Sequence, residues 1–508
     1  KINANIVYVM VIVCGVLTGL NKGAFDGCAL LSRIEIPDSV TNIGVGAFNG
    51  CSSLESITIP FVGASKTANN GYNQVFGYIF GYETTTSSSS TLSGAILQYS
   101  EDSSYYWYYI PSSLEHVVIS GGASTIPSYA FYNCSGLTSI ALPDSVTSIG
   151  GDAFKGCTGL TSTYYTGDVA SWCGISGLGN LMSYGSSTKT LYFDENKVEG
   201  ELIIPDSVTS IPSSAFRGCT GLTSITIGNS VTSIGSSAFS GCTGLTSIYY
   251  TGDVAGWCGI SGLGNLMLSS KTLYIGGNKV EGELIIPDSV TSIGDYAFSG
   301  CTGLTSITIP DSVTSIGEGA LKGCSSLESI TIPFVGANDT TSSTYYRVFG
   351  YIFGCTTTST SSTVDGAIMQ HYTYYSYSNE YIYYWYYIPS SLKSVVIGDG
   401  ATSIPYHAFY NCRGLTSITI GSDVTTIVNE AFYNCRGLTS VYYKGTKSKW
   451  NNISIGNGNS YLTSTTRYYY SETEPPLNSD GTAYDDNYWH YDTDGKTIVI
   501  WKKANEEE

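Results

Sequence analysis

The stretch that decides the fold is IPDSVTSIGDYAFSGCTGLTSIT, residues 286–308, which continues directly into IPDSVTSIGEGALKGCSSLESIT, residues 309–331. Three prolines mark the same place in successive copies, because Pro287, Pro310 and Pro333 stand 23 residues apart. A fixed period of this length is typical of solenoids, in which each repeat forms one coil that covers the next. The sequence therefore predicts a solenoid built from 23-residue rungs.

The apolar residues of one rung predict a short strand followed by an irregular return path. Leu304, Ile307 and Ile309 follow the spacing L-x-x-I-x-I, whose alternation places these side chains on one buried face of a strand. Pro310 ends the strand because it has no backbone N–H to donate. Since a single rung leaves its apolar faces in water, we expect stability to come from the stacked array.

A cysteine closes each rung, and the ten cysteines at this position form five pairs whose members stand 23 residues apart. Equivalent strands lie about 5 Å apart, a distance that does not exclude disulfides, but the parallel side chains disfavour them. A zinc site is a weaker alternative, because no C-x-x-C occurs and the thiols are spread along the array. We therefore predict a buried column of thiols formed by Cys28, Cys51, Cys134, Cys157, Cys219, Cys242, Cys301, Cys324, Cys412 and Cys435.

The first kind of interruption is rich in tyrosine and occurs twice, at residues 61–110 and 334–388. Each copy contains VFGYIFG, a Ser/Thr tract and a tyrosine run that ends in YYWYYIPSSL. The strand spacing L-x-x-V-x-I resumes immediately afterwards, at Leu114 and at Leu392. We interpret YYWYY as an extended segment with aromatic residues on both faces, one covering the neighbouring rung and the other presented outward.

The second kind of interruption contains a Trp-Cys pair and also occurs twice, at residues 164–200 and 249–282. Asp168 and Asp253 are expected to cap short helical turns, with Trp172 and Trp257 as inward anchors. Each copy ends in a predicted hairpin, for which Asn-Lys and Gly-Asn provide the expected turn sites. A diverged third copy carries Trp450, and the tail at residues 488–501 is expected to form a hairpin that caps the last rung.

These patterns divide what we expect to be one continuous solenoid into ten segments. Repeats occupy residues 1–60, 111–163, 201–248, 283–333 and 389–441. Tyr/Ser-rich insertions occupy 61–110 and 334–388, Trp-Cys insertions occupy 164–200 and 249–282, and the C-terminal cap occupies 442–508.

The chain resembles the leucine-rich repeat class, and specifically its BspA-like (Treponema-type) branch. The resemblance rests on L-x-x-I-x-I-P, SVTSIG and A-F-x-x-C within the 23-residue unit, which covers most of the chain. It implies a strand-rich α/β horseshoe-type solenoid with parallel concave strands and short helical or irregular convex segments. It also implies a secreted or cell-surface protein that acts in adhesion and binds host proteins. The inserted hairpins and short helices depart from a plain horseshoe.

The sequence offers little support for catalysis, a cofactor or a metal ion. None of the four histidines lies in a metal or nucleophile motif, and His116 takes a solvent-facing slot of a predicted strand. The aspartates of the recurring PDSV turns supply only one carboxylate per rung, whereas calcium needs about six to eight oxygen ligands. Capping of the turns explains these aspartates without an ion. We therefore predict no enzyme, no cofactor and no metal site.

Charge and hydropathy restrict the possible partners. The net charge of -18, with only 22 Lys and Arg residues, repels nucleic acid and anionic bilayers. The apolar run at residues 6–17 is too short to span a membrane and is similar in length to the core of a signal peptide. Because LTGLNKGAF at residues 17–25 continues the repeat register, we favour a degenerate first repeat over a signal remnant. We expect no membrane insertion.

Two surfaces remain as candidates for binding. Outward strand positions carry Ser and Thr, namely Ser139, Ser224, Thr226, Ser247, Ser306, Thr308, Ser417 and Thr419, and this uncharged face offers few anchors. Tyrosine supplies contact area at a small entropic cost, as recognition loops do, although each ring can equally be structural. The candidate binding residues are Tyr105, Tyr106, Trp107, Tyr108, Tyr109, Tyr383, Tyr384, Trp385, Tyr386 and Tyr387.

We therefore expect a non-enzymatic extracellular or cell-surface protein that binds a protein or a glycan through its Tyr-rich insertions, in adhesion. Two copies of the insertion would make it multivalent. The alternative is a structural protein that self-assembles into filaments or a surface layer. This alternative is motivated by the apolar strand at residues 6–13, which could pair with another molecule.

Overall fold

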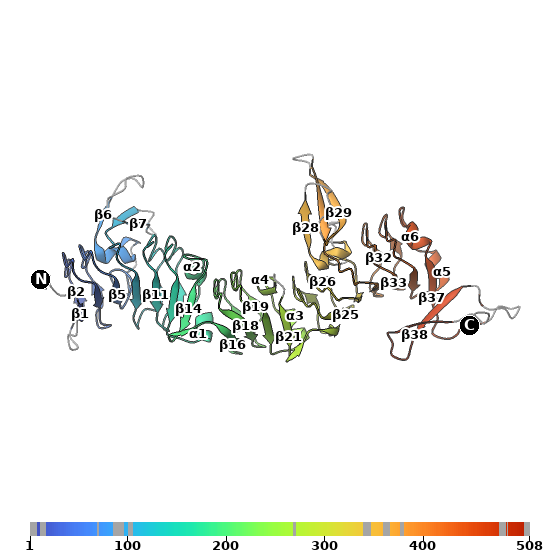
Figure 1. Ribbon diagram of the computed structural model, residues 1–508, viewed down its shortest axis with the longest axis horizontal. Helices are drawn as coiled ribbons and strands as arrows, with labels where there is room; N and C mark the ends of the chain where they lie inside the picture. Colours follow the sequence, from blue (N-terminus) through green and yellow to red (C-terminus); the bar gives the residue numbers. More distant parts are fainter. Residues whose placement is uncertain are drawn as a thin grey trace. The chain divides into compact units, whose positions relative to one another are not determined.

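The computed structural model describes residues 8–10, 17–68, 71–84, 96–99, 105–267, 271–338, 347–358, 366–375, 380–476, 484 and 486–501. The chain forms two compact units, residues 1–247 and residues 248–508. Within each unit, short parallel strands stack side by side and the segments that link them return along the other side of the stack (Figure 1).

The first unit contains one eight-stranded sheet and a further pair of parallel strands. The first sheet has the order β1 (Tyr8–Met10), β3 (Arg33–Glu35), β5 (Ser56–Ile59), β9 (His116–Ile119), β11 (Ser139–Leu142), β13 (Ser162–Tyr165), β14 (Thr190–Phe193) and β15 (Asn196–Lys197). Strand β16 (Gly200–Ile204) pairs in parallel with β18 (Leu222–Ile227). Three short pairs line the return path: β2 (Gly19–Leu20) with β4 (Asn42–Ile43), β10 (Thr125–Ile126) with β12 (Ser148–Ile149), and β17 (Ser210–Ile211) with β19 (Ser233–Ile234).

The second unit repeats this plan. It contains β20 (Ser247–Tyr250), which begins at the last residue of the first unit, then β21 (Thr272–Ile275) and β22 (Asn278–Lys279). Its main sheet has the order β23 (Gly282–Ile285), β25 (Leu304–Thr308), β27 (Ser329–Ile332), β31 (Ser394–Ile397), β33 (Ser417–Ile420), β35 (Ser440–Tyr443), β37 (Thr466–Tyr470), β38 (Asn487–Tyr491) and β39 (Ile498–Ile500). The return path carries β24 (Ser292–Ile293), β26 (Ser315–Ile316), β32 (Ser403–Ile404), β34 (Thr426–Ile427) and β36 (Ser454–Ile455).

The strand register confirms the predicted 23-residue rung and the leucine-rich repeat solenoid. Ile307 of β25 lies opposite Ile330 of β27, and each is 1% exposed. On the return path Ser292 lies opposite Ser315, so the same offset holds on both sides of the coil. In the eight-stranded sheet of the first unit, β1 pairs in parallel with β3. A strand of the expected degenerate first repeat would pair in this way.

The predicted cysteine column is present, and it is tied from rung to rung. None of the ten thiols forms a disulfide, and nine of them are buried while Cys28 is half-buried. In every pair the second thiol donates to the phenylalanine carbonyl of the preceding rung, as Cys157 Sγ does to Phe131 O at 3.0 Å. The Phe131 and Phe154 rings stack at 5.0 Å between centroids. Sulfur and ring columns thus form the core of the return side.

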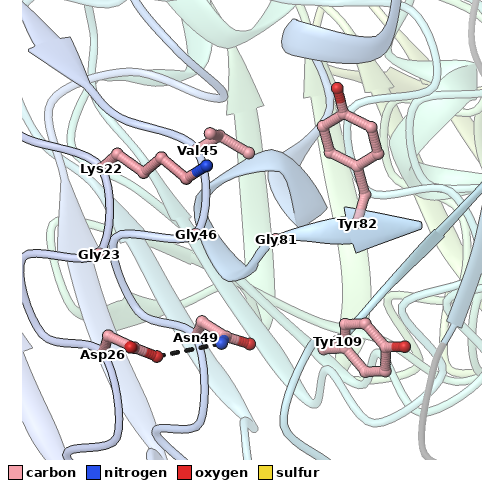
Figure 2. A pocket seen from close by; sticks show the side chains of 9 residues that line it. All are labelled: Lys22, Gly23, Asp26, Val45, Gly46, Asn49, Gly81, Tyr82 and Tyr109. Carbon is pink, nitrogen blue, oxygen red and sulfur yellow. Dashed lines mark hydrogen bonds between the residues drawn. The ribbon is translucent and has the colours of Figure 1, made fainter. Parts of the chain in front are cut away.

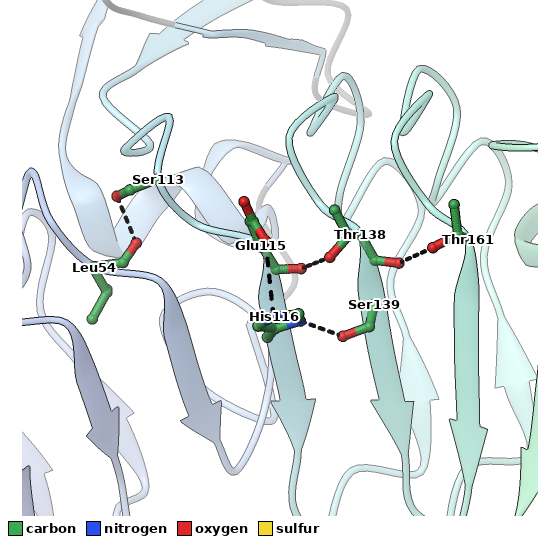
Figure 3. A network of polar contacts seen from close by, with 7 residues as sticks. All are labelled: Leu54, Ser113, Glu115, His116, Thr138, Ser139 and Thr161. Carbon is green, nitrogen blue, oxygen red and sulfur yellow. Dashed lines mark hydrogen bonds and ion pairs between the residues drawn. The ribbon is translucent and has the colours of Figure 1, made fainter.

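Threonine hydroxyls link the rungs along the strand side (Figure 3). Thr138 Oγ1 donates to Glu115 O at 3.1 Å, and Thr161 Oγ1 donates to Thr138 O at 3.3 Å. On the outer face, His116 lies exposed as expected, with Nδ1 2.8 Å from Ser139 Oγ. Part of the Ser/Thr content therefore ties rungs together.

One predicted outward residue is buried. Thr419 is 1% exposed, although we expected it on the Ser/Thr face. Its neighbour in register is Tyr442, whose ring stacks on Tyr468 at 5.1 Å and meets the edge of Trp489 at 5.7 Å. The large aromatic side chains of the C-terminal rungs thus accompany the burial of this position.

The tyrosine-rich interruptions preserve the register of the solenoid. The helical turn η2 (Phe76–Phe80) takes the place of the A-F segment of a rung, because Phe76 N–H donates to Ala130 O at 2.7 Å, as Phe131 N–H donates to Ala153 O at 2.7 Å. Its counterpart η4 (Phe349–Phe353) makes the equivalent bond through Phe349. Each interruption is therefore one rung with an excursion attached.

The Trp-Cys interruptions form capped helical turns, as predicted. Helices α1 (Val169–Cys173), α2 (Gly179–Met182), α3 (Val254–Gly259) and α4 (Gly264–Met267) occupy the first two copies, and α5 (Lys447–Asn451) and α6 (Ser460–Thr463) occupy the third. Asp168 Oδ1 accepts from Ser171 N–H, and Asp253 Oδ1 accepts from Gly256 N–H, both at 2.8 Å. Trp172 and Trp257 are fully buried, and their indoles donate to rung carbonyls at 3.0 and 2.9 Å.

The expected hairpins are present, but their turns lie elsewhere. In the first, the left-handed turn residues are Asp194 and Glu195, and in the second they are Gly276 and Gly277. Asn196–Lys197 and Asn278–Lys279 are strand residues, so the predicted Asn-Lys and Gly-Asn turn sites are wrong by one or two residues. Pairing of Tyr192 with Lys197 fixes this register. The predicted terminal hairpin is confirmed by the antiparallel pairing of β38 with β39.

Replacing Trp172 by phenylalanine tests the indole anchor. The substitution keeps a ring but leaves the buried Ala215 carbonyl without the donor that lies 3.0 Å away. We expect a loss of about 1–3 kcal/mol in unfolding free energy, measured by urea denaturation. Tyr433→Phe, at a side chain that is 44% exposed, should change stability by less than about 0.5 kcal/mol. Equal midpoints for both variants would show that the indole bond is not needed.

Candidate ligand-binding site

Each tyrosine-rich excursion folds into a small antiparallel sheet that stands out from the rungs (Figure 1). In the first, β8 (Tyr105–Tyr108) lies between β6 (Tyr82–Thr84) and β7 (Ile96–Tyr99). In the second, β30 (Glu380–Tyr386) lies between β28 (Cys355–Thr358) and β29 (Ile368–Tyr375). The recurring YYWYY segment therefore forms the central strand of each sheet.

The structure divides the ten candidate residues into buried and accessible groups. Trp107 and Trp385 are 6% exposed, and Tyr108 and Tyr386 have no exposed surface. The expectation that the second face of the segment is presented outward is therefore wrong for the two tryptophans, which lie on central strands flanked on both sides. Five side chains are half-buried: Tyr106, Tyr109, Tyr383, Tyr384 and Tyr387. The side chain of Tyr105 is outside the described part.

The two fully buried tyrosines attach the sheets to the rungs. Tyr108 packs directly on Gly77 of η2, where an added Cβ would stand 2.3 Å from the ring. Its hydroxyl donates to Tyr72 O at 2.9 Å. Tyr386 packs on Gly350 in the same way, and burial raises its pKa far above the usual value of tyrosine. These rings are structural.

Two buried glutamines complete the attachment, and they were not singled out from the sequence. Gln98 Oε1 accepts from Gly77 N–H at 2.9 Å, while Nε2 donates to Tyr132 O at 2.8 Å and approaches Cys134 Sγ at 3.4 Å. Gln370 makes the equivalent bonds in the second sheet. The shared pattern G-A-I-x-Q, at residues 94–98 and 366–370, is the signal that could have identified them.

An open cavity of about 510 Å³ lies where the small sheet of the first Tyr-rich insertion meets the first two rungs (Figure 2). Tyr82 and Tyr109 come from the inserted segment, and both rings are half-buried. Opposite them, Asn49 Nδ2 donates to Asp26 Oδ1 at 3.0 Å. The remaining lining residues are Lys22, Gly23, Val45, Gly46 and Gly81.

The lining combines aromatic surface with groups that donate and accept hydrogen bonds. Lys22 carries a positive charge and Asp26 a negative one, so the side chains of the cavity have no net charge. Tyr82 belongs to an aromatic cluster, with its ring 5.6 Å from Tyr72 and 5.3 Å from Tyr106. Burial, the largest cause, raises the pKa of Tyr82, so its hydroxyl stays protonated at neutral pH. The cavity suits a neutral polar ligand.

The equivalent place in the second unit is filled by a side chain. Tyr296 stands where the first unit has Gly23, and Lys322 stands where it has Asn49. The Tyr296 ring covers Gly319, where an added Cβ would lie 2.9 Å from Cε1. Lys322 Nζ lies 5.6 Å from the centre of that ring. The two copies of the module thus differ at the place where the cavity lies.

No metal centre is found in the described part of the chain, where no three His, Cys, Asp or Glu side chains are grouped to hold an ion. The aspartates of the PDSV turns are exposed, and Asp206 Oδ1 accepts from Asn229 N–H of the next rung at 3.0 Å. His407 is buried with Nε2 3.0 Å from Glu430 Oε2, and burial is the largest cause lowering its pKa. None of the described helices has the length and apolar character to cross a bilayer.

Comparison with known proteins identifies one family. The family described as BspA type leucine rich repeat region matches the chain in six copies, over residues 14–89, 101–172, 188–256, 277–367 and 379–466. No curated protein matches the chain.

Solved structures of bacterial repeat proteins are similar to the chain. A leucine rich cell surface protein from Faecalibacterium prausnitzii is 23% identical, with a TM-score of 0.33 over 73% of this chain and 98% of that one. A leucine-rich repeat protein from Bacteroides ovatus is 21% identical, with a TM-score of 0.27 over 87% and 76%. One from Eubacterium ventriosum is 18% identical, with a TM-score of 0.31 over 73% and 87%.

The thiol column should resist alkylation until the solenoid unfolds. Burial raises the pKa of the Cys157, Cys301 and Cys435 thiols to about 12. At pH 8 the reactive thiolate is then about one part in ten thousand of each group. Iodoacetamide labelling followed by peptide mass spectrometry should modify the half-buried Cys28 and Cys355 first and the other three only in urea. Native labelling of Cys157 at the rate of Cys28 would contradict the column.

Proposed function

The chain belongs to the BspA-type leucine-rich repeat family, and on this premise we propose that it is a non-enzymatic binding protein of the cell surface or the extracellular medium. Its role is adhesion, and its ligand is a host protein or a glycan. The stacked rungs are the scaffold, and the Tyr-rich insertions carry the binding surface. Their half-buried tyrosines, rather than the four buried aromatic residues, make the contacts.

The observation that carries this proposal is the cavity formed by Tyr82, Tyr109 and the loops of two rungs. Rigid strands and turns hold its walls, so little conformational entropy is lost when a ligand binds. The tyrosine rings offer apolar surface with a polar tip. Asp26 and Asn49 offer a carboxylate and an amide on the opposite wall.

A glycan is the ligand that this cavity favours. Sugar hydroxyls both donate and accept hydrogen bonds, and the lining has groups of both kinds. Because Lys22 and Asp26 balance each other, a neutral saccharide meets no uncompensated charge. Tyr296 fills the equivalent place in the second unit, so we expect one molecule of such a ligand per chain.

Closing the cavity tests the proposal. Gly23 has φ of 64° and Tyr296 has φ of 58°, so tyrosine is compatible with this left-handed backbone. Gly23→Tyr should reduce binding on a glycan and host-protein array at least about tenfold, which corresponds to about 1.4 kcal/mol. Gly23→Ala carries the same backbone strain without a ring and should keep the signal.

Equal array signals from the wild-type chain, Gly23→Tyr and Gly23→Ala would remove this cavity as the binding site. A far-UV circular dichroism spectrum identical for the three chains is the control for folding. Loss of signal in Gly23→Ala alone would also contradict the proposal, because that variant leaves the cavity open.

A second candidate function is self-assembly, and the place of β1 favours it. Strand β1 lies at one end of the order of the eight-stranded sheet, where its hydrogen-bonded neighbour is β3. An edge strand of this kind presents backbone N–H and C=O groups to another chain.

Light scattering as a function of concentration tests this second function. The intact chain should form larger particles as concentration rises, and a chain lacking residues 1–16 should not, because the edge strand is removed. If both chains scatter alike at every concentration, β1 does not drive assembly.

A further inference from the structure

Two cavities with matching walls lie beside the Tyr-rich sheets, one in each unit. Their volumes are about 300 Å³ in the first unit and about 440 Å³ in the second. Each is lined by two phenylalanines, two isoleucines, two leucines, one proline and one column cysteine. Both are separate from the polar cavity beside Gly23, with which they share no lining residue.

The geometry of the walls is reproduced as closely as their composition. The rings of Phe76 and Phe131 lie 5.0 Å apart at 40°, and those of Phe349 and Phe409 lie 5.0 Å apart at 38°. The Ser/Thr tracts within the same insertions differ in sequence. The two cavities are therefore the same structure built twice.

Each cavity opens where a proline interrupts the cysteine column. Leu114 N–H donates to Pro111 O at 3.1 Å, just as Leu137 N–H donates to Cys134 O at 3.2 Å in the next rung. Pro111 thus stands where an ordinary rung has its cysteine. Pro389 takes the same place before Leu392 in the second unit. No thiol fills the space in front of Cys134 or Cys412.

The size of this space can be judged at the glycine that precedes the leucine of each rung, from the distance between an added Cβ and its nearest atoms. At Gly136 and Gly414, an added Cβ would find its nearest atoms at 3.6 and 3.7 Å, which is ordinary contact. In ordinary rung pairs the equivalent glycines are crowded by backbone oxygens, at 2.6 Å for Gly159 and Gly244 and at 2.3 Å for Gly437. A side chain at this glycine therefore fits beside the two cavities and would clash with backbone in the ordinary rung pairs.

The amide and ammonium groups around the cavities are already paired within the chain, and Ser112, Ser135 and Ser390 add hydroxyls to the linings. Gln98 Nε2 is directed to Tyr132 O and Cys134 Sγ, and Gln370 Nε2 to the equivalent atoms. Lys393, the one charged residue of either lining, donates from Nζ to Ser390 O at 2.9 Å. The walls that remain are apolar, and apolar cavities of this size bind neutral rings in preference to water.

We propose that each cavity binds one small, uncharged apolar molecule of one or two rings, so that the chain holds two. This inference is independent of the proposed glycan site, because no residue is shared. Phenylalanine and proline rings of the wall contact the ligand, and burial of its apolar surface supplies the affinity.

Titration with the neutral fluorophore 6-propionyl-2-(dimethylamino)naphthalene, whose aromatic part is two fused rings, tests the proposal. The wild-type chain should bind two molecules with enhanced fluorescence. Gly136→Phe and Gly414→Phe place a ring in one cavity each without backbone strain, and should each reduce the number bound to one. The double variant should bind none. Gly151→Phe, at an exposed position with nothing within 4 Å, is the matched control and should still bind two.

Two results would overturn the proposal. One is a wild-type chain that shows no saturable fluorescence, and the other is a double variant that binds as many molecules as the wild type. If either phenylalanine variant loses the native circular dichroism spectrum, Gly136→Leu and Gly414→Leu provide the same stoichiometry test with smaller side chains.

Discussion

Every feature of this chain depends on one constraint: the buried face of each rung must be covered by the rung that follows. An inserted segment therefore has to leave the coil and return without shifting the register. The first excursion does so by starting and ending at one place, because Tyr109 N–H donates to Gly81 O at 3.2 Å. Tyr387 N–H and Gly354 O close the second excursion at 3.3 Å. The rung continues beneath the sheet, and β5 still pairs with β9.

This constraint separates the positions that can vary from those that cannot. Residues that cover the next rung, such as Phe76 and Phe349, are the same in both modules. Gly23 of the first unit corresponds to Tyr296 of the second unit, so a cavity lies beside the Tyr-rich sheet in one unit and a ring covers the equivalent place in the other. The surface beside the Tyr-rich sheet thus differs between the two units while the rungs keep the same fold. The insertions also leave apolar cavities, because at Pro111 and Pro389 a proline stands where other rungs have a column cysteine.

The period of 23 was sufficient to predict the rungs and the cysteine column, and the recurring Trp-Cys insertion predicted the Trp anchors. The turns of the two hairpins were displaced, since Asp194 and Glu195, and Gly276 and Gly277 in the second hairpin, take the left-handed conformation in place of the predicted pairs. Burial of Trp107 was missed because it depends on β6 and β7, whose pairing has no periodic signal. The cavity beside Gly23 could not be predicted, since it joins residues from two rungs and an insertion.

Amide hydrogen exchange measured residue by residue tests the central claim that each Tyr-rich insertion is a rung in register. The account predicts that Phe76 and Phe349 amides are protected to the same degree as those of Phe131 and Phe409, because all four donate to the carbonyl of an alanine in the next rung. Exchange of Phe76 and Phe349 at the rate of exposed loop amides, with Phe131 and Phe409 protected, would contradict it.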